Sequence, residues 1–179
     1  VLSWAASGSS TNNFTVFLNG ASYFHFKKMA IKRNGSGTYA NTVEIDNGGH
    51  NNSFEHCQIF SVPSINTSTT QCPIYHNNTT NAPDSGNLFD QNYIKDGSSS
   101  IYLYKSAAGN DYHNMFTNNI IKDGYYYQCY FYYQDRLIFT GNTFKTTGGY
   151  TYQYNLFYYC SGGTHVDKNK FLEANGYYI

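Results

Sequence analysis

The chain has 179 residues, 11 basic and 11 acidic side chains, a formal net charge of zero and 20 tyrosines. Only 12% of its residues are charged, whereas a soluble domain usually has about a quarter. This balance disfavours nucleic acid as a partner, because phosphate backbones are bound by clustered basic side chains. No apolar run approaches the roughly 18 to 20 residues of a membrane span.

Residues 1–22 precede the first recognisable repeat, and we expect them to form a lead-in or a partial coil. They contain no initiator Met, charged leader or long apolar core. We therefore expect the chain to be a mature form or a piece of a longer secreted or surface protein.

One short pattern then recurs: an apolar residue, two further residues, usually an asparagine, one residue, and a second apolar residue. The copies are 54–59, 89–94, 116–121, 139–144 and 166–171, with a weaker one at 26–31. Their fourth positions, residues 29, 57, 92, 119, 142 and 169, lie 28, 35, 27, 23 and 27 residues apart. A variable period of this size predicts a solenoid of stacked coils rather than a single-core globule.

The stretch 88–114 shows how one coil is built. The sequence predicts strands at 88–91, 93–95 and 101–105, with a tight corner at Asn92 and a turn at 96–100. Strands this short, separated by polar turns, pair with the same strand one coil onward and form three parallel sheets. We expect about six such coils in residues 23–179.

Asparagine at the corner has a physical reason. It tolerates the left-handed backbone region that a two-residue corner needs, and stacked asparagines hydrogen-bond along the stack. We expect this ladder to be internal, with Cys57 filling one position as a small apolar side chain; the alternative is that asparagine only marks surface turns. The predicted ladder consists of Cys57, Asn92, Asn119, Asn142 and Asn169.

The four cysteines, Cys57, Cys72, Cys129 and Cys160, have no metal-binding spacing. A disulfide is not favoured, and if one forms we expect it between Cys57 and Cys72.

These units, with their Asp-Gly turns and short alternating strands, resemble right-handed parallel β-helices of the pectate-lyase-like superfamily, which includes carbohydrate-binding and sugar-hydrolase repeats. The resemblance covers about residues 23–179 and implies an all-β fold. It does not specify an activity, because the repeat is shared by lyases, hydrolases and non-enzymatic adhesins. Calcium-dependent lyases of this superfamily carry outward carboxylates on successive strands, where this chain has tyrosines.

Glu44 and Asp46 are two residues apart on a predicted strand, so both project from one face. Their backbones lie about 6.6 to 7 Å apart, a spacing compatible with the acid and base of a polysaccharide-cleaving enzyme. The alternative is an ordinary solvated strand face.

Alternation along the same class of strand predicts an outward row of tyrosines, namely Tyr75, Tyr102, Tyr104, Tyr130 and Tyr132. Each ring offers an apolar face and a hydroxyl, which suits sugar rings. Two alternatives stay open, stacking among the tyrosines alone and a protein interface.

Two weaker candidates complete the set. Asp96 and Asp123 stand in equivalent Asp-Gly turns of neighbouring coils, where a calcium ion or the adjacent lysines are expected to neutralise them. His113 follows Asp111 closely, but the sequence places no nucleophile beside it.

We therefore expect an extracellular or cell-surface module that acts as a rigid, adhesin-like or glycan-binding stalk without a required cofactor. Its expected partners are a polysaccharide or cell-surface glycan, and further coils, a cap or a partner protein at the open ends of the stack. The alternative is a fragment of a polysaccharide lyase or glycoside hydrolase.

Overall fold

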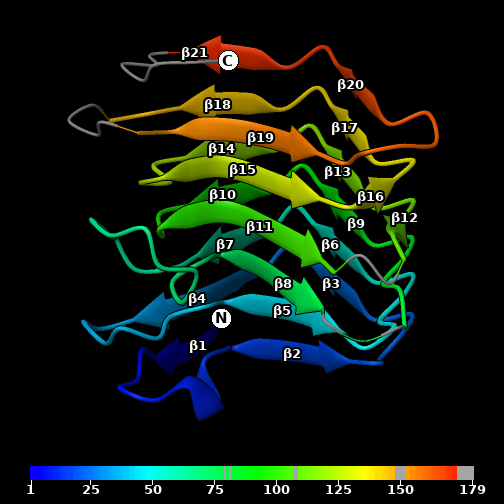
Figure 1. Ribbon diagram of the computed structural model, residues 1–179. Helices are drawn as coiled ribbons and strands as arrows, with labels where there is room; N and C mark the ends of the chain where they lie inside the picture. The colour runs from blue at the N-terminus through cyan, green and yellow to red at the C-terminus, as the bar shows by residue number, and fades with distance from the viewer. Residues whose placement is uncertain (79, 81, 107–108, 148–151, 173–179) are drawn as a thin grey trace.

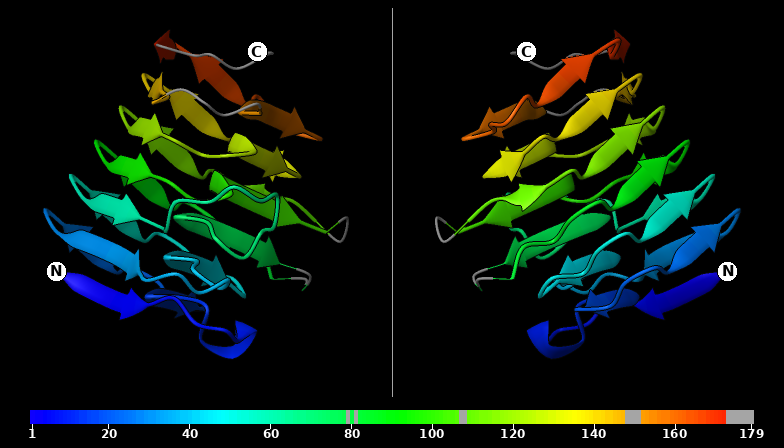
Figure 2. Two further views of the ribbon diagram at one scale, coloured as in Figure 1. Left: turned by 90° about the vertical axis from the view of Figure 1, so that its left-hand side faces the viewer. Right: turned by 90° about the vertical axis from the view of Figure 1, so that its right-hand side faces the viewer.

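A computed structural model describes residues 1–78, 80, 82–106, 109–147 and 152–172, and it shows one stack of short parallel strands (Figure 1). Six successive groups of three strands, from β2–β3–β4 to β19–β20–β21, follow one another along the stack, and β1 precedes them. The predicted class, an all-β parallel solenoid of about six coils, is confirmed. Figure 2 shows that β1 and β21 lie at opposite ends.

The β1 sheet has seven strands, which pair in parallel in the order of the stack. They are β1 (Leu2–Ala5), β4 (Ala30–Asn34), β7 (Gln58–Phe60), β10 (Tyr93–Lys95), β14 (Ile120–Lys122), β18 (Thr143–Lys145) and β21 (Lys170–Leu172). Because β1 pairs with β4, residues before position 23 already contribute to the stack.

The β3 sheet has six strands, and a tight corner joins each of them to the following strand of the β1 sheet. They are β3 (His25–Lys27), β6 (Ser53–Glu55), β9 (Leu88–Asp90), β13 (Met115–Thr117), β17 (Ile138–Thr140) and β20 (His165–Asp167).

The β2 sheet contains the longest strands and forms the third side of the coil. Its strands are β2 (Val16–Asn19), β5 (Val43–Asp46), β8 (Ile74–Asn78), β11 (Ser99–Lys105), β15 (Tyr127–Tyr132) and β19 (Tyr154–Tyr158). Two short strands, β12 (Asp111–Tyr112) and β16 (Gln134–Asp135), pair beside it.

Helical structure is minimal in the part of the chain that the structure describes. It consists of one 3-10 turn, Ser10–Asn12, and no helix there is long and apolar enough to cross a membrane.

Each tight corner contains one residue in the left-handed region, and this residue precedes the ladder position. The φ angles are 53° at Lys28, 52° at His56, 53° at Gln91, 56° at Asn118, 69° at Gly141 and 54° at Lys168. The prediction that the ladder asparagine itself takes this conformation is therefore wrong. The left-handed residue turns the chain, and the next side chain is then free to point into the coil.

The corner asparagines hydrogen-bond from coil to coil inside the stack. Asn92 N donates to Asn119 Oδ1 at 2.9 Å, and Asn119 N donates to Asn142 Oδ1 at 3.0 Å. Asn142 N donates to Asn169 Oδ1 at 2.9 Å, and Cys57 N donates to Asn92 Oδ1 at 2.8 Å. The side-chain amide of Asn119 also donates to Phe89 O at 2.9 Å. These contacts satisfy main-chain groups that the corner leaves without strand partners.

A second column of asparagines, which the sequence analysis did not predict, lies at the start of the β3 sheet. Asn52 N donates to Asn87 Oδ1 at 3.1 Å, and Asn87 N donates to Asn114 Oδ1 at 3.2 Å. The column ends at Gln134, whose Oε1 accepts from Asn114 Nδ2 at 3.3 Å.

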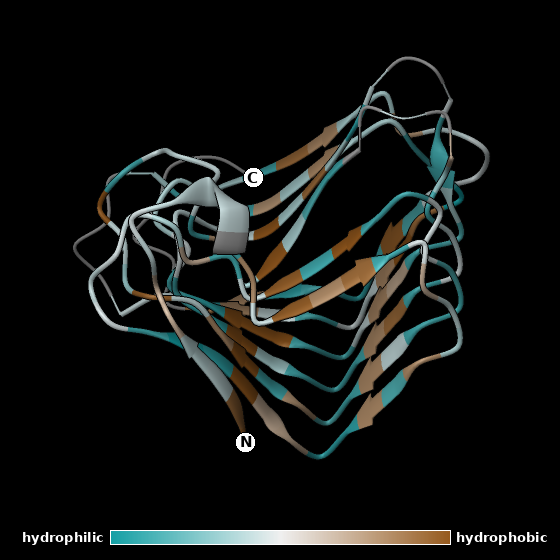
Figure 3. Cartoon of the chain, turned by 90° about the horizontal axis from the view of Figure 1, so that it is seen from below, coloured by the Kyte–Doolittle hydropathy of each residue, from teal (hydrophilic) through white to brown (hydrophobic). Residues whose placement is uncertain are grey.

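The interior between the sheets is filled by equivalent apolar side chains of successive coils. Figure 3 shows that hydrophobic residues recur along the strands of all three sides of the coil. Phe26, Phe54, Phe89 and Phe116 form one column, with ring centroids 4.6, 4.9 and 4.8 Å apart and interplanar angles of 3°. Cys57 is 1% exposed and belongs to this core, as predicted, and all four thiols are free, so no Cys57–Cys72 disulfide forms.

The corner column gives a stability prediction. We expect Asn119→Ala to lower the free energy of unfolding by about 1–3 kcal/mol, because it leaves the buried Asn92 N–H without its partner and removes the side-chain bond to Phe89 O. Urea denaturation measures this change. Asn110→Ala, which removes one exposed bond to Ser161 Oγ, is the control and is expected to cost less than about 1 kcal/mol. Equal losses in the two variants would contradict a stabilising role of the column.

Candidate functional site

The outer face of the β2 sheet carries the predicted tyrosines. Along β8, β11 and β15 the buried side chains alternate with partly exposed ones. The buried set includes Ile74, Ile101, Leu103, Cys129 and Phe131. The partly exposed set includes Tyr75, Tyr102, Tyr104, Tyr130 and Tyr132, and we call these five residues the tyrosine face.

The rings of the tyrosine face stack on one another along the solenoid. Tyr75, Tyr102 and Tyr130 are in register, with ring centroids 5.8 and 4.7 Å apart and interplanar angles of 14° and 16°. Tyr104 and Tyr132 form a second column at 4.9 Å and 23°. Because neighbouring rings cover most of the ring faces, a ligand meets mainly the ring edges and the hydroxyl groups.

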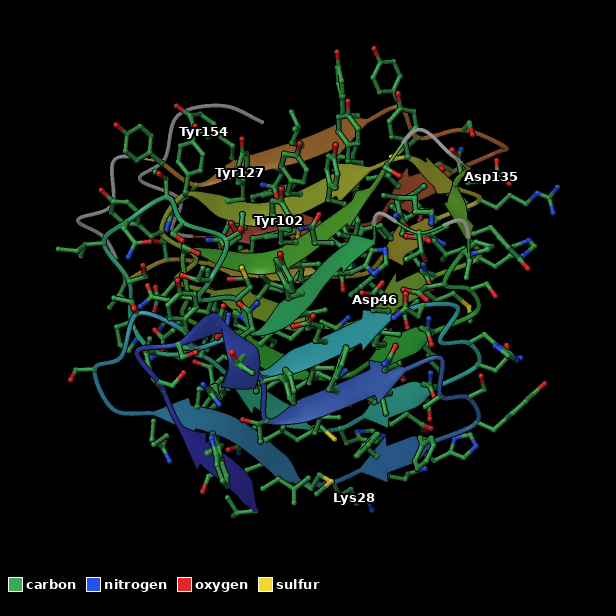
Figure 4. The ribbon with its side chains drawn as sticks, turned by 60° about the horizontal axis from the view of Figure 1, so that its bottom comes forward. Lys28, Asp46, Tyr102, Tyr127, Asp135 and Tyr154 are labelled. Atoms are coloured by element: carbon green, nitrogen blue, oxygen red, sulfur yellow. The ribbon has the colours of Figure 1, made fainter. Side chains whose placement is uncertain are left out.

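The aromatic surface continues beyond the five predicted residues. Tyr158 lies in register with Tyr132, with ring centroids 5.1 Å apart, so it extends the second column. Tyr127 contacts Tyr130 edge-on at 4.9 Å, and its ring centroid is 6.1 Å from that of Tyr154. Figure 4 shows Tyr102, Tyr127 and Tyr154 on the same side of successive coils.

The hydroxyl groups of Tyr75, Tyr102 and Tyr127 stay protonated in neutral solution. Burial raises the pKa of Tyr75 and of Tyr127 to about 12, and it also raises the pKa of Tyr102. A protonated phenol both donates and accepts hydrogen bonds, so the row offers a ligand an uncharged surface with both functions.

Glu44 and Asp46 lie on β5, at the edge of the tyrosine face. Both side chains are half-buried and point outward, because the alternate residues Val43 and Ile45 are buried. Glu44 is in register with Tyr75 on the next coil. Burial, followed by the charge of Asp46, raises the pKa of Glu44 to about 7, and burial also raises the pKa of Asp46.

Asp96 and Asp123 follow the register-matched Lys95 and Lys122 on neighbouring coils, and these lysines neutralise them. Lys95 Nζ is 2.9 Å from Asp96 Oδ2, and Lys122 Nζ is 3.8 Å from Asp123 Oδ2. Both oxygens of Asp123 also accept bonds from Thr147, at 2.7 and 2.6 Å. The lysine contacts supply one of the two expected means of neutralising this pair.

A buried acid–histidine cluster, which the sequence analysis missed, lies inside the stack. His76 Nδ1 is 2.8 Å from Asp84 Oδ2 and 2.7 Å from Ile45 O, while Nε2 is 2.6 Å from Asp111 Oδ2. His76, Asp84 and Asp111 are at most 2% exposed. Burial alone lowers the pKa of His76, but the carboxylates of Asp111 and Asp84 hold it well above its ordinary value.

The cluster explains why Asp111 and His113 do not act together. Asp111 is fully buried against His76, whereas His113 is exposed and its Nε2 is 3.4 Å from Arg136 Nη1. One signal in the sequence pointed to the cluster: alternation from the buried Ile74 and the outward Tyr75 places His76 inside. The partners were not predictable, because they come from a loop and from another coil.

Comparison with known proteins finds no match to this chain. The chain matches no model of a protein family, no curated protein and no solved structure.

The raised pKa of Glu44 predicts a pH-dependent stability. Between pH 4.5, its ordinary pKa, and about 7 the folded chain binds more protons at this site than the unfolded chain. The site's contribution to stability is therefore complete below pH 4.5 and falls as pH rises through 7. We expect Glu44→Gln to gain stability relative to the natural chain over this interval, by at most about 3 kcal/mol.

Denaturant unfolding at pH 4.5 and pH 8 measures this difference. Glu55→Gln is the matched control, because Lys27 and Ser53 lower the pKa of Glu55 by hydrogen bonding and its replacement removes a favourable charge. Parallel pH profiles for the natural chain and Glu44→Gln would rule out the proposed environment of Glu44.

Proposed function

We propose that this chain is an extracellular or cell-surface module that binds glycans along the tyrosine face and serves as a rigid, adhesin-like stalk. We further propose that its coils are right-handed, as parallel crossover connections almost always are, and that it belongs to the pectate-lyase-like β-helix superfamily. The observation that carries the proposal is the row of stacked tyrosines, whose uncharged hydroxyl groups repeat at the coil spacing on a face of long strands.

The stacking determines how a glycan is recognised. A sugar ring carries hydroxyl groups around its rim, and these pair with groups that both donate and accept hydrogen bonds. The tyrosine columns hold such groups in two adjacent rows, because Tyr130 and Tyr132 lie two positions apart on β15 with ring centroids 6.1 Å apart. Ordering the hydroxyl groups before binding reduces the entropy lost on binding. An uncharged face also favours a neutral ligand over a polyanion.

Removal of two hydroxyl groups tests this proposal while leaving the rings stacked. We expect the double variant Tyr104→Phe, Tyr132→Phe to lose roughly 1–3 kcal/mol of binding free energy for a neutral polysaccharide. Isothermal titration against a panel of neutral and acidic polysaccharides provides the measurement. The control is Tyr93→Phe, which changes a tyrosine of the β1 sheet that contacts Phe60 edge-on.

Two outcomes oppose glycan binding. One is the absence of binding across the panel, and the other is a double variant that binds as tightly as the natural chain. If the chain instead self-associates in a way that the double variant reverses, the tyrosine face is a protein interface.

A second candidate function is cleavage of the polysaccharide by Glu44 and Asp46. It is favoured by one observation, the pKa of about 7 at Glu44 beside a second carboxylate, since a glycosidase needs one protonated and one ionised carboxyl group. We expect Glu44→Gln to abolish product formation in the same polysaccharide mixtures if cleavage occurs. Absence of product from the natural chain would leave binding as the function.

A further inference from the structure

The acid–histidine cluster has features that neither the core nor the proposed glycan face requires. His76 stands at an inward position of β8, where the paired residue of β11 is the apolar Leu103. Buried charges are costly and persist where they are paired or bind a metal.

The decisive feature is the hydrogen bonding of the buried Asp84 carboxylate. This residue is 2% exposed, and neither of its carboxylate oxygens accepts a well-oriented hydrogen bond from the described residues. Asp84 Oδ2 lies 2.8 Å from His76 Nδ1, but that nitrogen is also 2.7 Å from Ile45 O. Protonated His76 is the cation beside this carboxylate, and a metal ion at Nδ1 can take the place of that proton and fill the free lone pairs.

A third ligand lies at the same place. One ligand atom each from Asp46, His76 and Asp84 lies within 4.8 Å of the others. Two ligands of a tetrahedral metal ion with bonds of 2.0–2.2 Å lie about 3.3–3.6 Å apart. A small rotation of the half-exposed Asp46 side chain therefore closes the set, and its exposure gives an ion a path inward.

We propose that Asp46, His76 and Asp84 form a binding site for one divalent metal ion of the zinc class, coordinated through His76 Nδ1 and the two carboxylates. Asp111 is the positioning residue of this site.

The surroundings of the histidine match those of known metal ligands. A ligating histidine usually contacts a carboxylate through its other nitrogen, which fixes the ring. Here His76 Nε2 is 2.6 Å from Asp111 Oδ2. Asp111 is itself held by Asp84 N at 2.9 Å and by Gln134 Nε2 at 3.2 Å.

Size and charge select the kind of metal. The adjoining cavity, about 20 Å³ in volume, holds about one water molecule, so water cannot complete the six to eight oxygen ligands that calcium takes. An imidazole nitrogen combined with carboxylates favours zinc or a similar ion. The three aspartates carry −3 and Lys105, which bonds Thr80 O and Ala82 O, carries +1. A divalent ion that replaces the proton of His76 therefore balances the remaining −2.

The test is titration of the full chain, freed of metal by a chelator, with Zn²⁺ alone. We expect one ion per chain and a higher melting temperature at saturation. Asp84→Asn and Asp46→Asn are each expected to weaken binding at least about tenfold. Asp90→Asn, which changes a carboxylate on β9 outside the cluster, is the control and is expected to bind as the natural chain does.

His76→Ala also removes a ligand, but it opens a gap in the core and the variant can fail to fold. Asp46→Asn changes a half-exposed side chain, so it tests the site even if His76→Ala does not fold. A visible absorption band on Co²⁺ substitution, lost in Asp46→Asn, gives a second readout. The proposal is overturned by absence of saturable Zn²⁺ binding, by equal affinity in the Asp46 and Asp84 variants, or by preference for Ca²⁺. None of these outcomes bears on glycan binding.

Discussion

Coil-to-coil pairing in parallel register is the constraint on which the rest of this structure depends. Each strand bonds to its equivalent one coil onward, so each side chain lies next to the side chain at the same position of the next coil. This arrangement favours residue types whose side chains interact well with an identical side chain on the next coil. Phenylalanine stacks on phenylalanine inside, asparagine bonds to asparagine at the corners, and tyrosine stacks on tyrosine outside.

The same constraint explains the low content of charged residues, because register places like charges side by side. Where charges do occur, their neighbours compensate for the repulsion. Lys95, Lys122 and Lys145 are in register on three coils, and Asp96 and Asp123 stand beside the first two. At some positions the register pairs unlike residues, such as Glu44 with Tyr75 and His76 with Leu103. These are the positions at which we propose catalysis or metal binding.

Much of the fold could be predicted from the sequence, because pairing in register makes the same residue types recur once per coil. The spacing of Asn92, Asn119, Asn142 and Asn169 predicts the corners, and alternation along 101–105 predicts which side chains are buried. The left-handed residue was misplaced by one position, since lysine, histidine, glutamine, asparagine and glycine all take that conformation at the corners of this chain. The second asparagine column was not predicted, because its members, Asn52, Asn87 and Asn114, precede the repeated pattern.

The candidate site was less predictable. The alternation of side chains along the strands was enough to predict the tyrosine face. The stacking of its rings on one another was not predictable, because it depends on side-chain conformation. The buried cluster joins His76 to Asp84 in a loop and to Asp111 on a two-residue strand, and no period relates these three positions.

The central claim, that equivalent residues of neighbouring coils meet side by side, is tested most directly by disulfide trapping. Thr117 and Thr140 are partners in register on β13 and β17, at a separation that suits a disulfide. Oxidation of the double variant Thr117→Cys, Thr140→Cys is predicted to form that bond rapidly. The pair Thr117→Cys, Ile138→Cys lies two positions out of register and is predicted to stay reduced. Equal trapping of both pairs, or trapping of the second alone, would contradict the account.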